Sequence, residues 1–511
     1  MAGIFKTGAQ FPPESSIERL AKYERGRKIF AGKTYEVFDR ASDILKDTPA
    51  APQLEKLYIA VNLMDVLITK PADMLVGEAP VFETGKPDNS PEQVAMNRIV
   101  EENDLAQMVH ETTVGNGFRG DAFYKTYFDY RQDFSELTEI PDGVTKEPII
   151  ESQNPSYVFP ELSRGSTKKF KAVNIAYVEW VETGKDEIPY LVVERHVPGE
   201  IQHSRYKLQF SEGSVDVKYG VPITIYRIGD AVNTGRESDV EFTGVPRILV
   251  HHAPYKTTDE TWEGISGVEK LESVLAAIQD RLVQIDYILW KHSDPTAYGP
   301  DLEGAHGDSV QFGGKYIPIE ENDATPGYMT WDGQLDAAFK ELDYLLGLVY
   351  QMSETPQWLF GTTITAGDKG GTGTSHTDGA AIRARFMPIL SKVKRIRVHV
   401  DKALREAVWT AMELDNYANE DVEGFEPYTA VYPKIRWNDG LPRNEKEEAE
   451  IMAIRTGNKP TLDVRSAIKK QDDVDDEKAT EVIARIKKDE EDAYGTVDAS
   501  IFNLPEPVAD E

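Results

Sequence analysis

The sequence contains no cysteine among its 511 residues. This absence excludes disulfide frameworks, thiolate zinc sites, cysteine-ligated iron–sulfur clusters and cysteine nucleophiles. It also fits a protein that matures in a reducing cytoplasm. The sequence has no apolar run of about 18 residues, so we expect no membrane-spanning helix and no membrane partner.

Positive charge is scarce. The chain has 57 Lys and Arg against 88 Asp and Glu, which gives a formal net charge of −31. A surface this acidic repels nucleic-acid phosphates and anionic membranes at long range. The charge therefore argues against a protein that grips DNA or lipid, although it allows one that surrounds a DNA duplex without gripping it. Hydrophobic residues make up 40% of the chain, which predicts a folded protein.

No residue pattern supports an enzyme. The glycine-rich segment 367–375 lacks the Gly-Lys-Ser/Thr ending of a phosphate-binding loop, because Lys369 precedes its glycine pair. His251 and His252 are adjacent, and a strand would point them to opposite faces, which favours structural roles over metal ligation. We expect no catalytic residue, no metal and no cofactor. A hydrolase with dispersed carboxylates stays open as an alternative.

The first half of the chain predicts a mixture of helices and strands. Residues 1–50 are polar and predict a surface arm with short helices. Helices are expected at residues 54–75 and, after a cap at Ser90, from there to about residue 114. Residues 115–255 alternate short strand-like runs with turn residues, so they predict a mixed sheet. The fold class expected is therefore α+β. The expected strands are residues 122–130, 172–182, 190–196, 223–228 and 247–251.

Two later segments, residues 265–292 and 334–354, carry narrow apolar seams with alternating steps of three and four residues. Such a seam is typical of a helical rod that packs against another rod. Between the rods, a segment rich in glycine and proline holds strand candidates at residues 310–312 and 316–319. The seam residues are Leu271, Leu275, Ile278, Leu282, Ile285 and Leu289 in the first helix, and Leu335, Phe339, Leu342 and Leu346 in the second.

The rest of the chain begins with a Gly/Thr-rich segment, residues 355–376, that we expect to be irregular. A long helix is expected next at residues 378–416, and Pro388 would kink it. Its residues 378–406 hold eight basic and three acidic side chains. We expect this basic helix to dock on an acidic neighbour in the same chain or the next subunit. Direct phosphate contact is the alternative. A strand is expected at 428–437 and short charged helices at 444–452, 462–470 and 477–491.

The order of these elements, from about residue 54 to residue 491, resembles the portal proteins of tailed bacteriophages, especially those of siphophages. Each matching piece is short, and their order carries the resemblance. An extra Trp358-Leu359-Phe360 departs from the family pattern. The pieces are VGEAP (76–80), GVPRILV (244–250) followed by Tyr255-Lys256, GISGVE (264–269), MSETP (352–356) before the Gly/Thr segment, and IRWNDGLP (435–442).

The resemblance implies a portal fold in which named regions follow one another along the chain. They are an N-terminal arm and α+β wing (1–263), stem helix 1 (264–293), a small β clip (294–333), stem helix 2 (334–354), a tunnel loop (355–376), a wing helix and strand (377–443), a helical crown (444–491) and a loose C-terminal tail (492–511).

The resemblance also implies a function without catalysis. Portal proteins form a ring, usually of twelve copies, at one vertex of the capsid, and double-stranded DNA passes through it non-specifically during packaging and ejection. The implied partners are further copies of the chain, the terminase large subunit, head-completion or adaptor proteins, and the major capsid and scaffolding proteins. The implied location is the virion, with the host cytoplasm during assembly. The alternative is an acidic structural ring or lattice scaffold with no DNA passage.

Two expectations about sites follow. The tunnel loop would offer Lys369, Thr372, Thr374 and Ser375 for transient contacts with the DNA backbone. The two apolar seams would need more core than one chain offers nearby. They are therefore expected to pack rod against rod between neighbouring copies and so to close the ring.

Overall fold

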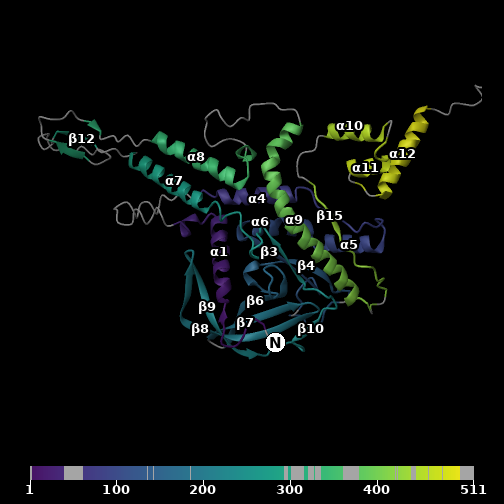
Figure 1. The fold of residues 1–511 in the computed structure, drawn as a ribbon, viewed down its shortest axis with the longest axis horizontal. Coiled ribbons are helices and arrows are strands. Elements are labelled where there is room, and N and C mark those ends of the chain that lie inside the picture. The colour runs from purple at the N-terminus through teal and green to yellow at the C-terminus, as the bar shows by residue number, and fades with distance from the viewer. Residues whose placement is uncertain are drawn as a thin grey trace, which may run out of the picture. The chain divides into compact units, whose positions relative to one another are not determined.

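The computed structural model describes residues 3–38, 61–134, 136–141, 143–183, 186–292, 297–300, 316–319, 327–328, 335–360, 379–420, 422, 424–438, 445–457, 460–472, 474 and 476–494 (Figure 1). With 46% helix and 23% strand, it is a mixed fold, consistent with the α+β class. The chain divides into two compact units. The first comprises Met1–Gly85 and Ala95–Gly440, and the second comprises Lys86–Val94 and Leu441–Glu511.

A seven-stranded antiparallel sheet dominates the first unit, in the order β1-β9-β8-β7-β6-β5, with β10 joined to β8. The strands expected around residues 172–182, 190–196 and 223–228 lie within β6, β7 and β9, whereas the long β8 was not predicted. The strands are β1 (Gln10–Phe11), β5 (Val158–Leu162), β6 (Phe170–Thr183), β7 (Asp186–Val197), β8 (Glu200–Lys218), β9 (Val221–Val232) and β10 (Val240–Phe242).

The N-terminal segment completes the core of this sheet. The rings of Phe5 and Phe11 lie 5.6 Å from the ring of Phe159, and all three side chains are buried. Helix α1 (Glu14–Phe30) follows and buries Ile17 and Ala21 among other residues. The expectation of a polar surface arm is therefore wrong, because widely spaced apolar residues in a polar segment anchor it to the sheet.

A smaller sheet, β11-β3-β4, supports the long helix α9 (Gly379–Ala418). Helix α9 packs against all three strands (Figure 1). Its bounds agree closely with the helix expected at residues 378–416. The strands are β3 (Asp121–Asp129), β4 (Glu147–Gln153) and β11 (Val250–Pro254), so the expected strand at 247–251 starts three residues too early. The buried face of α9 includes Ile389, Val393, Ile396, Val400, Leu404, Val408 and Met412.

Three helices differ from their expected bounds. Helix α4 (Leu63–Leu75) begins only after Asn62, whose side chain accepts a hydrogen bond from the Asp65 amide and so caps it. The helix expected up to residue 114 is two helices, α5 (Pro91–Glu102) and α6 (Leu105–Arg119). They are broken at Asp104, which has a left-handed φ of 43°. The cap expected at Ser90 is present, since its Oγ accepts from the Gln93 amide.

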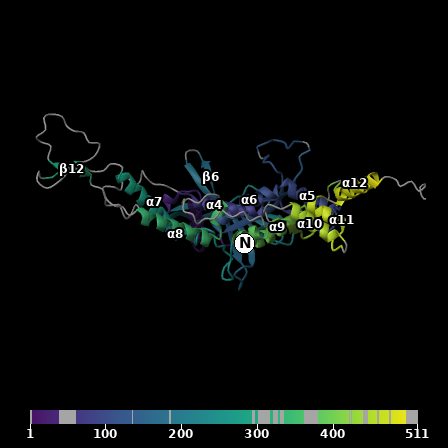
Figure 2. The ribbon, with the colours of Figure 1, turned by 90° about the horizontal axis from the view of Figure 1, so that it is seen from above.

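Helices α7 (Glu272–His292) and α8 (Leu335–Ser353) run antiparallel, side by side, in both views (Figures 1 and 2). Helix α7 starts seven residues later than Ile265, where the sequence predicted it. Between the two helices the chain forms a three-stranded sheet of β12 (Ala297–Pro300), β13 (Tyr316–Ile319) and β14 (Gly327–Tyr328). The strand expected at 316–319 is β13, whereas the one expected at 310–312 lies outside the described residues.

The second unit is helical, with α10 (Glu445–Thr456), α11 (Val464–Asp472) and α12 (Asp476–Tyr494). Helix α12 continues to residue 494, into the segment expected to be a loose tail. Within the first unit, the strand expected at 428–437 shrinks to β15 (Lys434–Arg436), which pairs with β2 (Val81–Glu83). The short 3-10 helices are η1 (Thr34–Glu36), η2 (Pro155–Tyr157) and η3 (Gln357–Phe360). No helix in the described part of the chain is long and apolar enough to cross a membrane.

Candidate functional site

The apolar seams of α7 and α8 are buried mainly within the chain itself. Most of the expected seam residues belong to one cluster with side chains of α1, α4 and α6, including Ile29, Met64 and Phe118. The expectation that the seams stay unsatisfied until neighbouring copies cover them is therefore wrong, because helices from the first 120 residues cover the base of the helical pair. The buried seam residues are Leu271, Leu275, Ile278, Ile285, Leu342 and Leu346, and Leu282 and Leu335 are partly buried beside them.

Two of the expected seam residues stay exposed. Leu289, near the end of α7, is 48% exposed, and Phe339, near the start of α8, is 45% exposed. Tyr344, at the middle of α8, is 68% exposed as well. The part of the helical pair near the three-stranded sheet thus presents large apolar side chains that the described part of the chain does not bury.

The helical pair joins the body through a tight backbone contact. A Cβ atom on Gly264 would lie 1.8 Å from the carbonyl oxygen of Gly120, so only glycine fits there. The carboxylate of Asp121 accepts a hydrogen bond from the Gly264 amide at 2.8 Å, and its Oδ1 lies 2.7 Å from Nε2 of His252. The Gly267 amide donates to the Gly117 carbonyl at 2.8 Å. These tertiary bonds explain why residues 264–271 do not extend α7.

The candidate DNA-contacting residues Lys369, Thr372, Thr374 and Ser375 lie outside the described residues, so they stay predictions. The segment that leads to them is partly regular, which corrects the expectation of an irregular loop from residue 355. Helix η3 occupies Gln357–Phe360, and the ring of Trp358 lies edge-on to Phe386 of α9 at 4.7 Å. The Trp-Leu-Phe insertion is therefore an anchor between α8 and α9.

Several basic side chains of α9 form hydrogen bonds with groups of the same chain. Lys392 and Arg405 donate to the backbone carbonyls of Leu67 and Pro433. Arg395 donates to the carboxylate of Glu354, at the end of α8. This pattern supports docking within the chain over direct phosphate contact for these three residues. Their acceptors are mostly carbonyl oxygens, not the acidic side chains that we expected.

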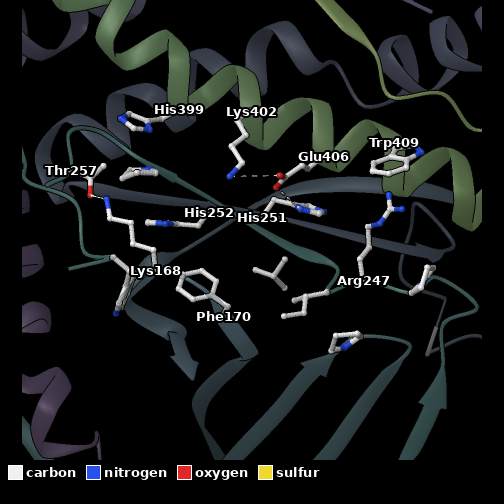
Figure 3. Close-up of a pocket in the computed structure, with 16 residues that line it drawn as sticks. Lys168, Phe170, Arg247, His251, His252, Thr257, His399, Lys402, Glu406 and Trp409 are labelled. Atoms are coloured by element: carbon white, nitrogen blue, oxygen red, sulfur yellow. Dashed lines mark hydrogen bonds and ion pairs between the residues drawn. The ribbon is translucent and has the colours of Figure 1, made fainter. Parts of the chain in front are cut away.

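A cavity of about 660 Å³ lies between α9 and the strand β11 (Figure 3). We call it the α9 groove. One face of α9 forms its upper wall. Its other residues come from β11, from the segments on either side of that strand, from the start of β6 and the residues just before it, and from the turn between β7 and β8. The α9 groove is lined by Lys168, Phe170, Pro198, Pro246, Arg247, Ile248, Val250, His251, His252, Pro254, Thr257, Trp262, His399, Lys402, Glu406 and Trp409.

The side chains of the α9 groove carry more positive than negative charge. Lys168, Arg247 and Lys402 are cationic, and Glu406 is the single acid among the lining residues. Burial opposes ionisation of Glu406, but a hydrogen bond from His251 and the charges around it prevail and hold the pKa of this carboxyl below its ordinary value. The pKa of His399 is also lowered, first by burial and then by neighbouring cations.

The two adjacent histidines have different partners, as their alternation on a strand requires. His252 pairs with Asp121 and stacks on Phe123 with ring centroids 4.7 Å apart. His251 is 6% exposed, and its Nδ1 lies 3.6 Å from Glu406 of α9. Periodicity could not have predicted that both would line one cavity with α9, because α9 lies about 150 residues further along the sequence.

Within the described residues, no group of three or more histidine or acidic side chains is arranged to hold a metal ion. No protein-family model matches the chain, and no curated protein matches it.

Proposed function

We propose that this chain is the subunit of a ring-shaped DNA conduit of the portal type, found at one vertex of a tailed-phage capsid. One observation carries the proposal. The antiparallel helices α7 and α8 flank a small three-stranded sheet, and along the chain this unit lies between an α+β body and the long helix α9. This order of elements is the one that the resemblance to portal proteins implies.

In this proposal α7 and α8 are the stem, the sheet β13-β12-β14 is the clip, and α9 with the two larger sheets is the wing. The ring cannot be argued from the buried seam, since the chain covers most of that seam itself. The proposed contact between copies is instead made by exposed apolar side chains of the helical pair, namely Leu289 and Phe339 near the clip and Tyr344 at the middle of α8. Burying such side chains between copies would favour closed association.

The net charge of −31 suits a channel through which DNA slides better than a protein that binds DNA tightly. Tight binding of phosphates would release counterions and hold the DNA in place, whereas an acidic wall lets a duplex slide. The basic side chains of α9 that bond Leu67, Pro433 and Glu354 are used inside the subunit. We therefore propose that contacts with DNA are few and without sequence specificity, and that ATP hydrolysis belongs to a partner motor.

Electron microscopy of the purified full chain tests this proposal. We expect closed rings with a central hole wide enough for a DNA duplex. Particles assembled without the chain should form shells that contain no DNA. Single subunits under assembly conditions, or DNA-filled heads in the absence of the chain, would refute the proposed function.

A further inference from the structure

We propose that the α9 groove binds an extended acidic peptide segment of a separate protein, which adds as a strand to the open edge of β11. This inference does not depend on the portal proposal. It rests on the strand register, the shape of the cavity and the charge of its lining, all within the first unit.

The first argument is that β11 is an edge strand. Within the described sheets it pairs only with β3. The Leu249 carbonyl accepts from the Thr126 amide at 2.8 Å, and the Tyr255 amide donates to the Gly120 carbonyl at 2.8 Å. Since bonded pairs alternate along an antiparallel ladder, residues 251 and 253 also face β3.

The alternation leaves the backbone groups of Val250 and His252 on the open side of β11. Pro254 has no N–H to offer there. Two N–H donors and two C=O acceptors therefore point away from the sheet. Such an edge is a template on which an extended peptide can form main-chain hydrogen bonds.

The second argument places the α9 groove along this edge. Side chains of consecutive strand residues point to opposite faces of a sheet, yet Val250, His251 and His252 all line the one cavity. A cavity over a single face would meet only alternate residues. The α9 groove therefore runs beside the strand, where residues of both faces are within reach.

The third argument concerns length. His399 and Trp409 mark the two ends of the α9 wall and are ten residues apart. At about 1.5 Å per residue the wall is about 15 Å long. An extended peptide advances about 3.3 Å per residue, so about five residues span it. Figure 3 shows Lys402 and Glu406, which lie between these two residues on α9, directed towards the strand below.

The fourth argument is charge. The cations Lys168, Lys402 and Arg247 are spread along the α9 groove, and Arg247 is paired at 2.9 Å with Glu413, which lies outside the lining. The one acid of the lining, Glu406, lies 3.6 Å from His251 and 3.9 Å from Lys402. Nη1 of Arg247 and Nε2 of His251 have no hydrogen-bond partner within the described residues. An acidic peptide matches this local surplus of positive charge, which stands out in a chain of net charge −31.

The test uses the full chain and a fluorescently labelled, blocked hexapeptide that alternates valine and glutamate, with anisotropy as the readout. We expect saturable binding that weakens as salt increases, and no binding of the counterpart that alternates valine and lysine. Absence of measurable binding, or equal binding of the lysine peptide, overturns the proposal. Displacement of the peptide by inorganic phosphate overturns it too, since the α9 groove would then be a site for small anions.

Two further comparisons separate strand addition from simple charge attraction. Hexapeptides N-methylated at one alternate set of residues should lose binding, whereas those methylated at the other set should bind as the parent does. Equal behaviour of the two sets contradicts pairing along an edge.

The protein variants Lys402→Glu and Lys394→Glu form a matched pair on α9. Lys402 lines the α9 groove and its side chain is 72% exposed, so its replacement should leave the fold intact. Lys394 is exposed outside the α9 groove. We expect about tenfold weaker binding for Lys402→Glu and less than about twofold for Lys394→Glu. Equal losses in the two variants overturn the assignment to this groove.

Discussion

Nζ of Lys392 lies 3.3 Å from the backbone carbonyl oxygen of Leu67 and donates a hydrogen bond to it. In a regular helix this carbonyl would accept from the amide of residue 71, but Pro71, inside α4, has no N–H. The long helix α9 therefore supplies the donor that α4 lacks. A lysine within a basic run thus has a specific structural partner about 325 residues away in the sequence.

This buried lysine should make stability depend on pH. Burial is the main cause that lowers its pKa from 10.5 to about 7, and the charge of Lys270 adds to it. The unfolded chain keeps the proton up to the ordinary pKa, so unfolding takes up a proton between about pH 7 and 10.5. The free energy of unfolding should rise with pH across this window, by up to about 1.4 kcal/mol per pH unit. This added stability should disappear as the pH falls back towards 7.

The variant Lys392→Met tests this relationship. Urea unfolding between about pH 7 and 10 should show a flatter dependence than in the parent, because the buried titrating group is gone. Lys394→Met, on the exposed side of the same helix, is the control and should keep the parent slope. If the free energy of unfolding of Lys392→Met depends on pH as steeply as that of the parent, this lysine is charged in the folded chain.

The contact between Gly264 and Gly120 predicts a severe effect of one methyl group. In Gly264→Ala the new Cβ would meet the Gly120 carbonyl oxygen at 1.8 Å, so the backbone must move. We expect a loss of about 3 kcal/mol in the free energy of unfolding. The control is Gly347→Ala in α8, where nothing lies within 4 Å and alanine should stabilise by roughly 0.5–1 kcal/mol. Equal stability of the two variants would contradict the described junction.

The buried seam should stabilise the individual subunit. Leu346 packs in the cluster shared by α7, α8 and the N-terminal helices. Leu346→Ala should lower the free energy of unfolding by about 2–5 kcal/mol, measured by urea denaturation of dissociated subunits. A change below about 0.5 kcal/mol would mean that the seam is not packed in the single chain.

The exposed apolar residues of α8 should act on association instead. The double variant Phe339→Ser and Tyr344→Ser removes two exposed rings. Thermal unfolding of the single subunit should change by less than about 0.5 kcal/mol, while rings seen by electron microscopy become fewer. Intact rings in this variant would place the contact between copies elsewhere on the chain.

Removal of residues 367–373 tests the predicted tunnel loop. We expect the deletion to leave the ring intact and to block DNA packaging, because the loop would contact the moving duplex without joining subunits. Packaging assays and electron microscopy of the same preparation measure both effects. Dissociation of the ring in the deletion variant would contradict this role.

The spacing of apolar residues predicted the helices that bury one apolar face. The steps of three and four residues in Leu335, Phe339, Leu342 and Leu346 correctly located α8, and the helix expected at residues 378–416 agrees with the bounds of α9 within two residues. The polar strand β8 was missed, because it is a strand through pairing with β7 and β9 on both sides. Hydrogen bonds between strands leave little trace in side-chain alternation.

The sequence could not predict which residues pack against an apolar face of a helix or strand. The seam of α7 and α8 gave no sign that Ile29, Met64 and Phe118 would bury its base, since those contacts join distant segments. The α9 groove was missed for the same reason. Its one sequence signal was the pair His251-His252, which we interpreted as structural because strand neighbours point apart. Neighbours can still meet one cavity at an open edge.

The mass of the purified full chain in solution, measured by native mass spectrometry over a range of concentrations, tests the central claim most directly. The account predicts a closed species of about twelve chain masses that persists on dilution. A single chain mass at every concentration, under conditions that support assembly, would contradict it.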